Sequence, residues 1–297
     1  MFTIFSTPKP FAGHIDVIQR NAIRSWQCLH PDIEIILVGD DAGAAETCKE
    51  FGIRHIKDVG RNRYGTKYLA SIYDQVQERA SHEILCHVNC DIILMSDFVR
   101  TANQVAARLN RFLMAGRRWD VEIRNPLDFT KADWERGVRE LAWRTNRPRP
   151  AQWIDYFLFR KNLYYQKIPE FVIGRPGWDN WLLWYPLSLQ VPVVDASREV
   201  VAVHQNHDYG YHPGGEEGVW HGEEARQNYQ LHQGKFATLA DATHVMRGGQ
   251  LQRNYQAWLA PLGRHAAAEW SRIWFALLDA TRSLRHRVGL RSRAARR

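Results

Sequence analysis

The stretch Glu83–Asp91 reads Glu-Ile-Leu-Cys-His-Val-Asn-Cys-Asp, and the apolar residues Ile92–Met95 follow it at once. A buried parallel strand has such a nearly continuous hydrophobic run, and ligands of open α/β sheets bind at the carboxyl ends of these strands. Side chains alternate along a strand, so Asn89 and Asp91 are expected on one face, within reach of one cation or one diphosphate. The stretch therefore predicts a metal-bridged phosphate site, and a strand that simply ends in a polar turn is the alternative.

The composition indicates a large folded domain. The 297 residues, 45% of them hydrophobic, are enough for one large α/β domain or two smaller ones. The four cysteines form no Cys-x-x-Cys pair, and no charged-then-apolar leader opens the chain. No apolar run approaches the ~18 residues of a membrane-spanning helix. We therefore expect a reducing, cytoplasmic setting. The twelve tryptophans suit either a bulky core or a sugar-binding surface.

The net charge of +8 is concentrated near the C-terminus. Residues 264–297 contain nine arginines and two acids, so the rest of the chain is close to neutral. Apolar residues recur at three- and four-residue spacing between Trp270 and Val288, which predicts an amphipathic helix with arginines on its flanks. Such a helix favours either an anionic membrane surface or docking on the domain, with a solvated arginine tail behind it. Nucleic acid is not expected as a partner, because the body offers no second basic patch.

The first hundred residues alternate between strand and helix patterns. Strands are predicted at 3–6, 33–38, 53–56 and 83–91, and helices at 15–29, 42–51, 69–76 and from Ser96 onward. This β-α-β-α order implies an α/β fold with a mostly parallel central sheet flanked by helices.

The second half of the chain is less regular. A strand at 112–115 is predicted to end at Gly116-Arg117-Arg118, and a charged helical insertion follows at 128–143. After a linker-like break at 146–150 we expect a strand at 153–159, an aromatic helix opened by the Gly/Pro loop before Asp179, and short strands at 190–194 and 200–203.

Three polar clusters follow these apolar segments: Asn89 with Asp91, Asp179 alone, and His204 with His207 and Asp208. A carboxylate and an imidazole are sufficient protein ligands for Mn²⁺ or Mg²⁺ when a diphosphate and water fill the other positions. Asp179 stands near a helix start, where the dipole favours its ionised form as a base, and a plain helix-capping aspartate is the alternative. The alternative for the two histidines is that they are exposed turn residues. At most one of them, His204 or His207, would then bind the metal.

The sequence Val88-Asn89-Cys90-Asp91-Ile92-Ile93, after an alternating β/α half, resembles the Asp-x-Asp region of GT-A fold nucleotide-sugar glycosyltransferases. The segments Gly116–Asp120, Gly174–Trp181 and His204–Tyr209 look like a little-characterised branch of glycosyltransferase-like proteins from bacteria and plants. The likeness covers roughly residues 1 to 260. Asn89 stands where the motif has its first aspartate.

The resemblance implies roles for particular residues. The last aspartate of the motif, here Asp91, would bind a divalent metal that bridges the nucleotide diphosphate, and His204 or His207 would complete the metal shell. Inverting members place a carboxylate base at a helix start, which matches Asp179. Asp40 matches the position where the family reads the nucleoside base.

The reaction implied is transfer of a sugar from a nucleotide-diphosphate sugar to an acceptor hydroxyl, with inversion favoured. Besides Asp40, the donor contacts predicted are Thr7, Arg63, Lys67, Asn89 and Arg117. The metal, with Arg63 or Lys67, would stabilise the departing diphosphate. If the enzyme instead retains configuration, no base is needed and Asp179 would orient the sugar. The acceptor is expected to be a glycan or a lipid-linked sugar. The protein would reach it from the inner face of the membrane, where the C-terminal helix would bind peripherally.

The expected organisation is one GT-A-like domain at residues 1–262, with a nucleotide-binding half to about residue 115 and an acceptor and metal half from 116. The basic helix and tail occupy 263–297. Two other functions stay open: a non-catalytic module that binds a glycan or a nucleotide sugar, and a sugar-1-phosphate nucleotidylyltransferase. The second would need a Gly-rich basic loop after the first strand, which Ser6–Pro10 does not supply.

Overall fold

The computed structural model describes residues 1–210, 212–255 and 257. The chain divides into two units, Met1–Asn254 and Tyr255–Arg297, and every strand that the structure describes belongs to the first. The predicted amphipathic helix and the tail at 263–297 lie outside the described residues. Among the described helices, none combines the length and the hydropathy that a membrane span needs.

A mixed sheet forms the centre of the first unit. Its strands are β1 (Thr3–Ser6), β2 (Glu34–Val38), β3 (Arg54–Ile56), β4 (Ile84–Val88), β5 (Ile92–Ile93), β6 (Leu113–Val121), β7 (Ile154–Arg160), β8 (Val193–Asp195), β9 (Ala202–Gln205), β10 (His244–Arg247) and β11 (Gln250–Arg253). The order is β11-β10-β8-β6-β7-β4-β1-β2-β3, and β9 pairs with both β5 and β6. Most pairs are parallel, but β7 runs antiparallel between β4 and β6. The prediction of an α/β fold with a mostly parallel sheet is confirmed.

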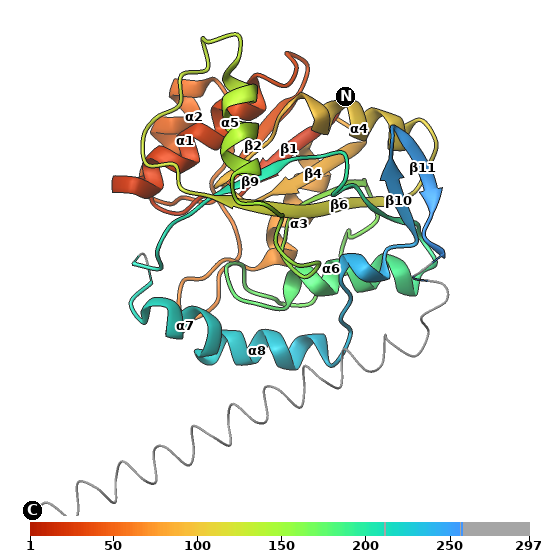
Figure 1. The fold of residues 1–297 in the computed structure, drawn as a ribbon. Coiled ribbons are helices and arrows are strands. Elements are labelled where there is room, and N and C mark those ends of the chain that lie inside the picture. The colour runs from red at the N-terminus through yellow and green to blue at the C-terminus, as the bar shows by residue number, and fades with distance from the viewer. Residues whose placement is uncertain (211, 256, 258–297) are drawn as a thin grey trace, which may run out of the picture. The chain divides into compact units, whose positions relative to one another are not determined.

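Helices cover both faces of this sheet. The α-helices of the described residues are α1 (Gly13–Gln27), α2 (Ala44–Phe51), α3 (Leu69–Arg79), α4 (Ser96–Ala106), α5 (Trp134–Trp143), α6 (Trp178–Ser188), α7 (Gly215–His221) and α8 (Glu223–His232), of which five form the two main packed layers. One apolar cluster joins the sheet to α1, α2 and α4, and a second joins it to α3 and α6. Figure 1 shows α1 and α2 on one side of the strands and α6 on the other.

The strands contribute alternately to these two clusters. In β2, Ile35 and Leu37 belong to the cluster with α1, whereas Ile36 and Val38 belong to the cluster with α3. Side chains point to opposite faces at successive positions, so a strand that is apolar at every position is buried on both sides. The continuous apolar runs in the first half of the chain therefore predict central strands.

Two strand ends differ from the prediction. β4 stops at Val88, because the chain turns directly afterwards: the Asn89 N–H still donates to the C=O of Asp155 in β7 at 2.9 Å, and the Ile92 N–H then donates to the Asn89 C=O at 3.1 Å and closes the turn. β6 does not end at Gly116 but continues to Val121, since β9 pairs with its second half. His204, expected in a loop, accordingly lies within β9.

Candidate metal and diphosphate site

Three parallel strands, β1, β2 and β4, end at one edge of the sheet. The segments that follow them are Thr7–Lys9, Gly39–Asp41 and Asn89–Asp91, and each contains a residue of the predicted site. Since ligands of open α/β sheets bind at the carboxyl ends of the strands, this is the edge where a ligand is expected.

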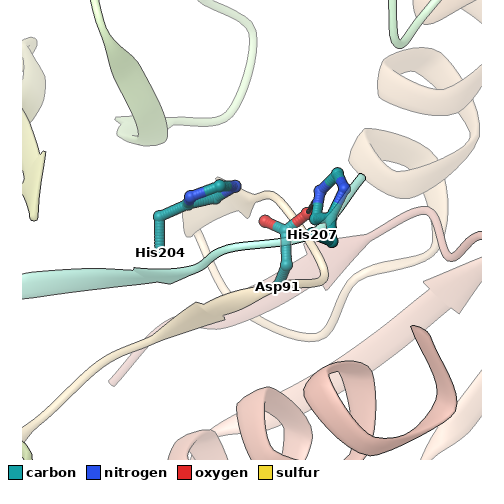
Figure 2. A group of neighbouring side chains, drawn as sticks. All are labelled: Asp91, His204 and His207. Atoms are coloured by element: carbon teal, nitrogen blue, oxygen red, sulfur yellow. Dashed lines mark hydrogen bonds and ion pairs between the residues drawn. The ribbon is translucent and has the colours of Figure 1, made fainter. Parts of the chain in front are cut away.

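Asp91, His204 and His207 lie together at this edge. Asp91 and His204 are 6% and 9% exposed, and one ligand atom from each of the three residues lies within 4.8 Å of the others. Strand pairing produces the cluster, because Ile92 of β5 is the register partner of His204 in β9. Figure 2 shows both imidazole rings beside the Asp91 carboxylate.

The Lys9 ammonium, which sequence reasoning missed, reaches the same cluster. Its Nζ is 3.0 Å from Asp91 Oδ2 and 3.0 Å from His207 Nε2. The buried Gln19 of α1 fixes the Lys9 backbone, since its amide accepts from the Lys9 N–H at 2.7 Å and donates to the Lys9 C=O at 2.9 Å. Burial alone would raise the pKa of Asp91, but Lys9 and the two imidazoles outweigh burial and hold that pKa well below its ordinary value. Asp91 is therefore an ionised group at neutral pH.

The donor set fits a divalent cation. A carboxylate oxygen and two imidazole nitrogens are ligands that Mn²⁺ and related ions accept. Asp91 Oδ1 is buried, and within the described part of the chain no hydrogen-bond donor reaches it. Such a group costs about 1–3 kcal/mol, which a bound cation would remove. Opposite ligands of an octahedral ion lie ~4.2 Å apart, so small side-chain rotations would bring all three residues onto one ion.

A second polar network lies behind the cluster. Arg118 donates from Nε to Asp120 at 2.8 Å and from Nη1 to Asp155 at 2.9 Å, and Asn89 donates to the other oxygen of Asp155 at 2.6 Å. The Asn89 amide thus contacts Asp155 and not the Asp91 group, so Asn89 and Asp91 do not share a face as the strand pattern predicted. Asn89 and Asp91 both lie in the turn after β4, where side chains no longer alternate between the two faces of the sheet. Burial alone would raise the pKa of Asp120, but His204 and Arg118 lower it.

Thr7 and Lys67 meet at the end of β1. Lys67 is 5% exposed, and its Nζ donates to Thr7 Oγ1 at 2.7 Å and to the Pro8 C=O at 2.9 Å. It also forms an ion pair with Asp41. Burial lowers the pKa of Lys67, and the Asp41 carboxylate opposes that effect.

Three other predicted donor contacts lie apart from the Asp91 group. Asp40 pairs with Arg61 at the rim of a separate cavity of about 380 Å³. Arg63 is exposed and pairs with Glu223 of α8 at 2.5 Å. Arg117 lies at an irregularity in the β6–β7 register, and its backbone N–H donates to Ser197 Oγ at 2.8 Å. Arg118, the next residue, carries the guanidinium of the polar network.

Asp179 lies in the first turn of α6, and its carboxylate accepts from the Asn180 backbone N–H at 3.0 Å. Burial raises the pKa of Asp179 to about 7; the hydrogen bond from Asn180 opposes this and the charge of Asp155 adds to it. The neighbouring Trp178 packs on the buried ring of His87 from β4, with ring centres 5.5 Å apart, which fixes the start of the helix.

A cleft of about 790 Å³ opens beside the histidines. It is lined by Arg118, Asp120, Glu122, Arg149, Trp153, His204, Asn206, His207, Tyr209, Glu216, Glu217, Trp220 and His221. The guanidinium carbons of Arg118 and Arg149 lie 4.8 and 4.6 Å from the centre of the Trp153 ring. The Trp153 and Trp220 rings pack edge to face, with their centres 5.7 Å apart. Sequence reasoning noted the high tryptophan content but did not predict which tryptophans gather here, because they come from two distant segments.

Comparison with known proteins gives distant matches only. No protein-family model matches the chain, and no curated protein sequence matches it. Among solved structures, TarS from S. aureus has 9% identity and a TM-score of 0.41, over 69% of this chain and 58% of the TarS chain. Glucosyl-3-phosphoglycerate synthase from Mycobacterium tuberculosis, solved with Mn²⁺ and UDP, has 12% identity and a TM-score of 0.44, over 70% of this chain and 72% of its own.

A protein from Desulfovibrio desulfuricans, named as a nucleotide-diphospho-sugar transferase, has 9% identity and a TM-score of 0.44, over 79% of this chain and 96% of its own. These structural neighbours are nucleotide-sugar glycosyltransferases of the GT-A type at low sequence identity. Likeness this distant says nothing about activity, so the function has to follow from the side chains of the chain itself.

Proposed function

We propose that this chain is a metal-assisted glycosyltransferase that moves a sugar from a nucleotide-diphosphate sugar to an acceptor hydroxyl. The observation that carries the proposal is the Asp91, His204 and His207 group, placed at the carboxyl edge of the sheet beside an open cleft. Carboxylate and imidazole donors can hold a divalent ion and leave positions for two phosphate oxygens.

The surrounding cations suit a diphosphate. A bound Mn²⁺ or Mg²⁺ would neutralise charge that develops on the leaving nucleotide diphosphate. Lys9 already contacts Asp91 and His207, and Lys67 lies with Thr7 at the end of the neighbouring strand. Fixed cations at the point where negative charge develops lower the barrier without any reorganisation during the reaction.

Asp179 is the proposed base for an inverting transfer. Its pKa of about 7 matches the task, because a general base works best when its pKa lies near the operating pH. The carboxylate would take the proton from the acceptor hydroxyl as the new glycosidic bond forms. Analysis of the product anomer by NMR distinguishes inversion from retention, and retention would leave Asp179 a role in orienting the sugar.

The acceptor is proposed to be a glycan. Trp153, Trp220 and Tyr209 present aromatic surface in the cleft beside the histidines, and sugar rings stack on such surfaces. The basic segment 263–297, which lies outside the described residues, is proposed to hold a cytoplasmic enzyme on an anionic membrane and so near a lipid-linked acceptor. Sedimentation with anionic liposomes after deletion of residues 264–297 tests that part, and unchanged binding refutes it.

The test of the catalytic proposal is turnover of nucleotide sugars by the Asp91→Ala variant. We expect loss of transfer, with folding checked by thermal melting, whereas Asp208→Asn should keep the wild-type rate. Asp208 is exposed, and the asparagine keeps the oxygen that accepts from the Gly210 N–H at 3.0 Å. An undiminished rate in Asp91→Ala would refute the proposal. Binding of nucleotide sugars without turnover by the wild-type chain would favour a non-catalytic binding module.

A further inference from the structure

Asp120 and His204 face each other across two paired strands. Asp120 of β6 is the register partner of His204 in the parallel strand β9. The His204 Nδ1 atom lies 3.3 Å from Asp120 Oδ1. Within the described residues this nitrogen is buried and has no hydrogen-bond partner of ideal geometry, so the carboxylate is the group that it faces.

Two arginines hold the Asp120 carboxylate in place. Arg118 Nε donates to Oδ1 at 2.8 Å, and Arg149 Nε forms an ion pair with Oδ2 at 2.9 Å. Arg118 is itself fixed by Asp155, and both guanidinium groups stack on Trp153. Because a guanidinium contacts each oxygen, the carboxylate cannot turn away from the imidazole without breaking an ion pair.

The second histidine of the cluster has the same arrangement. The Nδ1 atom of His207 lies 2.7 Å from the C=O of Asp208, and its Nε2 atom lies 3.2 Å from Asp91 Oδ2. In both histidines, Nδ1 thus faces an oxygen that can accept a hydrogen bond: the Asp120 carboxylate for His204 and the Asp208 C=O for His207. In Figure 2 the ring of His204 extends toward Asp91 and His207, which leaves Nε2 as the nitrogen for the cluster.

An imidazole that binds a metal through one nitrogen carries its proton on the other. An oxygen acceptor at that second nitrogen selects the tautomer and fixes the ring plane. We propose that Asp120 is a positioning residue that holds His204 in the Nδ1–H tautomer, so that the Nε2 lone pair is directed at the Asp91 cluster. The proposal deepens the metal site of the proposed function and rests on it.

The first test measures the tautomer without any metal. Long-range ¹H–¹⁵N spectra of the full chain at pH 8, where a free imidazole is neutral, separate the two tautomers by their nitrogen shifts. The His204 signals are assigned by their loss in His204→Gln. We expect the Nδ1–H form in the wild type and a mixture in Asp120→Ala. An Nε2–H form in the wild type would overturn the proposal.

The second test measures Mn²⁺ affinity by electron paramagnetic resonance of the free ion. Loss of an acceptor behind a metal-binding histidine typically weakens binding by about 10–100-fold, and we expect a loss of that size in Asp120→Ala, which has no oxygen to face His204 Nδ1. Glu122→Gln is the matched control: it lies on the same cleft wall, contacts Asn206 at 3.0 Å, and should bind Mn²⁺ like the wild type. Equal affinity of Asp120→Ala and the control would also overturn the proposal.

The two readouts separate this proposal from the function on which it rests. If the wild type binds no Mn²⁺ at all, the proposed metal site fails, while the tautomer measurement still decides whether Asp120 controls His204. Thermal melting of each variant establishes that a lower affinity does not come from unfolding.

Discussion

The Asp179→Asn substitution should stabilise the protein at alkaline pH while it removes the proposed base. Burial raises the pKa of this carboxyl to about 7, against an ordinary value of 3.8. The unfolded chain therefore releases the proton near pH 4, whereas the folded chain keeps it until about pH 7. Between these values the unfolded state binds fewer protons, so the free energy of unfolding of the wild type falls as the pH rises.

The size of this loss follows from the two pKa values. Each tenfold difference between the acid constants is worth 1.36 kcal/mol, so ionising Asp179 in the folded state costs at most about 4 kcal/mol above pH 7. Partial exposure of the side chain to solvent reduces that figure. An asparagine cannot ionise, and its amide oxygen can still accept from the Asn180 N–H. The variant should thus match the wild type at pH 4 and exceed it at pH 8.

Urea denaturation measured from pH 4 to pH 8.5 tests this expectation. With a denaturant slope of about 3 kcal/mol/M, the midpoint of Asp179→Asn should rise by up to roughly 1 M relative to the wild type at pH 8. Asp58→Asn, at an exposed carboxylate, should show no such pH-dependent gain. Transfer activity should fall by about 10²–10⁴-fold in Asp179→Asn if the residue is the base. A variant that is equal to or less stable than the wild type at pH 8 would refute the argument from burial.

Two further predictions concern the same edge of the sheet. Gly39→Ala should destabilise the fold by about 1–3 kcal/mol in thermal melting, because Gly39 has φ +116 and a Cβ there would lie 2.6 Å from Lys67 Cε. Gly137→Ala, inside α5 with no atom within 4 Å of the new Cβ, should instead add about 1 kcal/mol, and equal effects would contradict the strain argument. Lys9→Met should tighten Mn²⁺ binding about tenfold without nucleotide, because the ammonium competes for Asp91 and His207, and weaker binding would contradict this.

The first half of the fold could be predicted because local pattern decides it. Continuous apolar runs and amphipathic stretches mark β1 to β4 and α1 to α3 within a few residues. The place of β7 could not be predicted in this way. It pairs antiparallel with β4 and β6, and pairing between segments this far apart depends on the packed core and not on neighbouring residues.

The residues of the candidate site also fall into those that local pattern identifies and those that it does not. Asp91, His204 and His207 could be named because each follows or ends an apolar run, and the β5–β9 register then brings them together. Arg118 could not be selected over Arg117, since the register shift between Ala115 and Arg117 changes which side chains share a face. Lys9 stands between two prolines in a loop without periodicity, and its direction depends on long-range contacts: Gln19 of α1 holds its backbone, and Asp91 and His207 contact its ammonium.

The central claim is that Asp91, with the two histidines, links a divalent ion to a nucleotide diphosphate. Isothermal titration of UDP, GDP and TDP, each with and without Mn²⁺, tests this most directly in the wild type and in Asp91→Asn. We predict that at least one of the three nucleotides binds the wild type tenfold more tightly or better when Mn²⁺ is present, and that Asp91→Asn removes this gain. Affinities that do not depend on Mn²⁺ for all three nucleotides would contradict the claim.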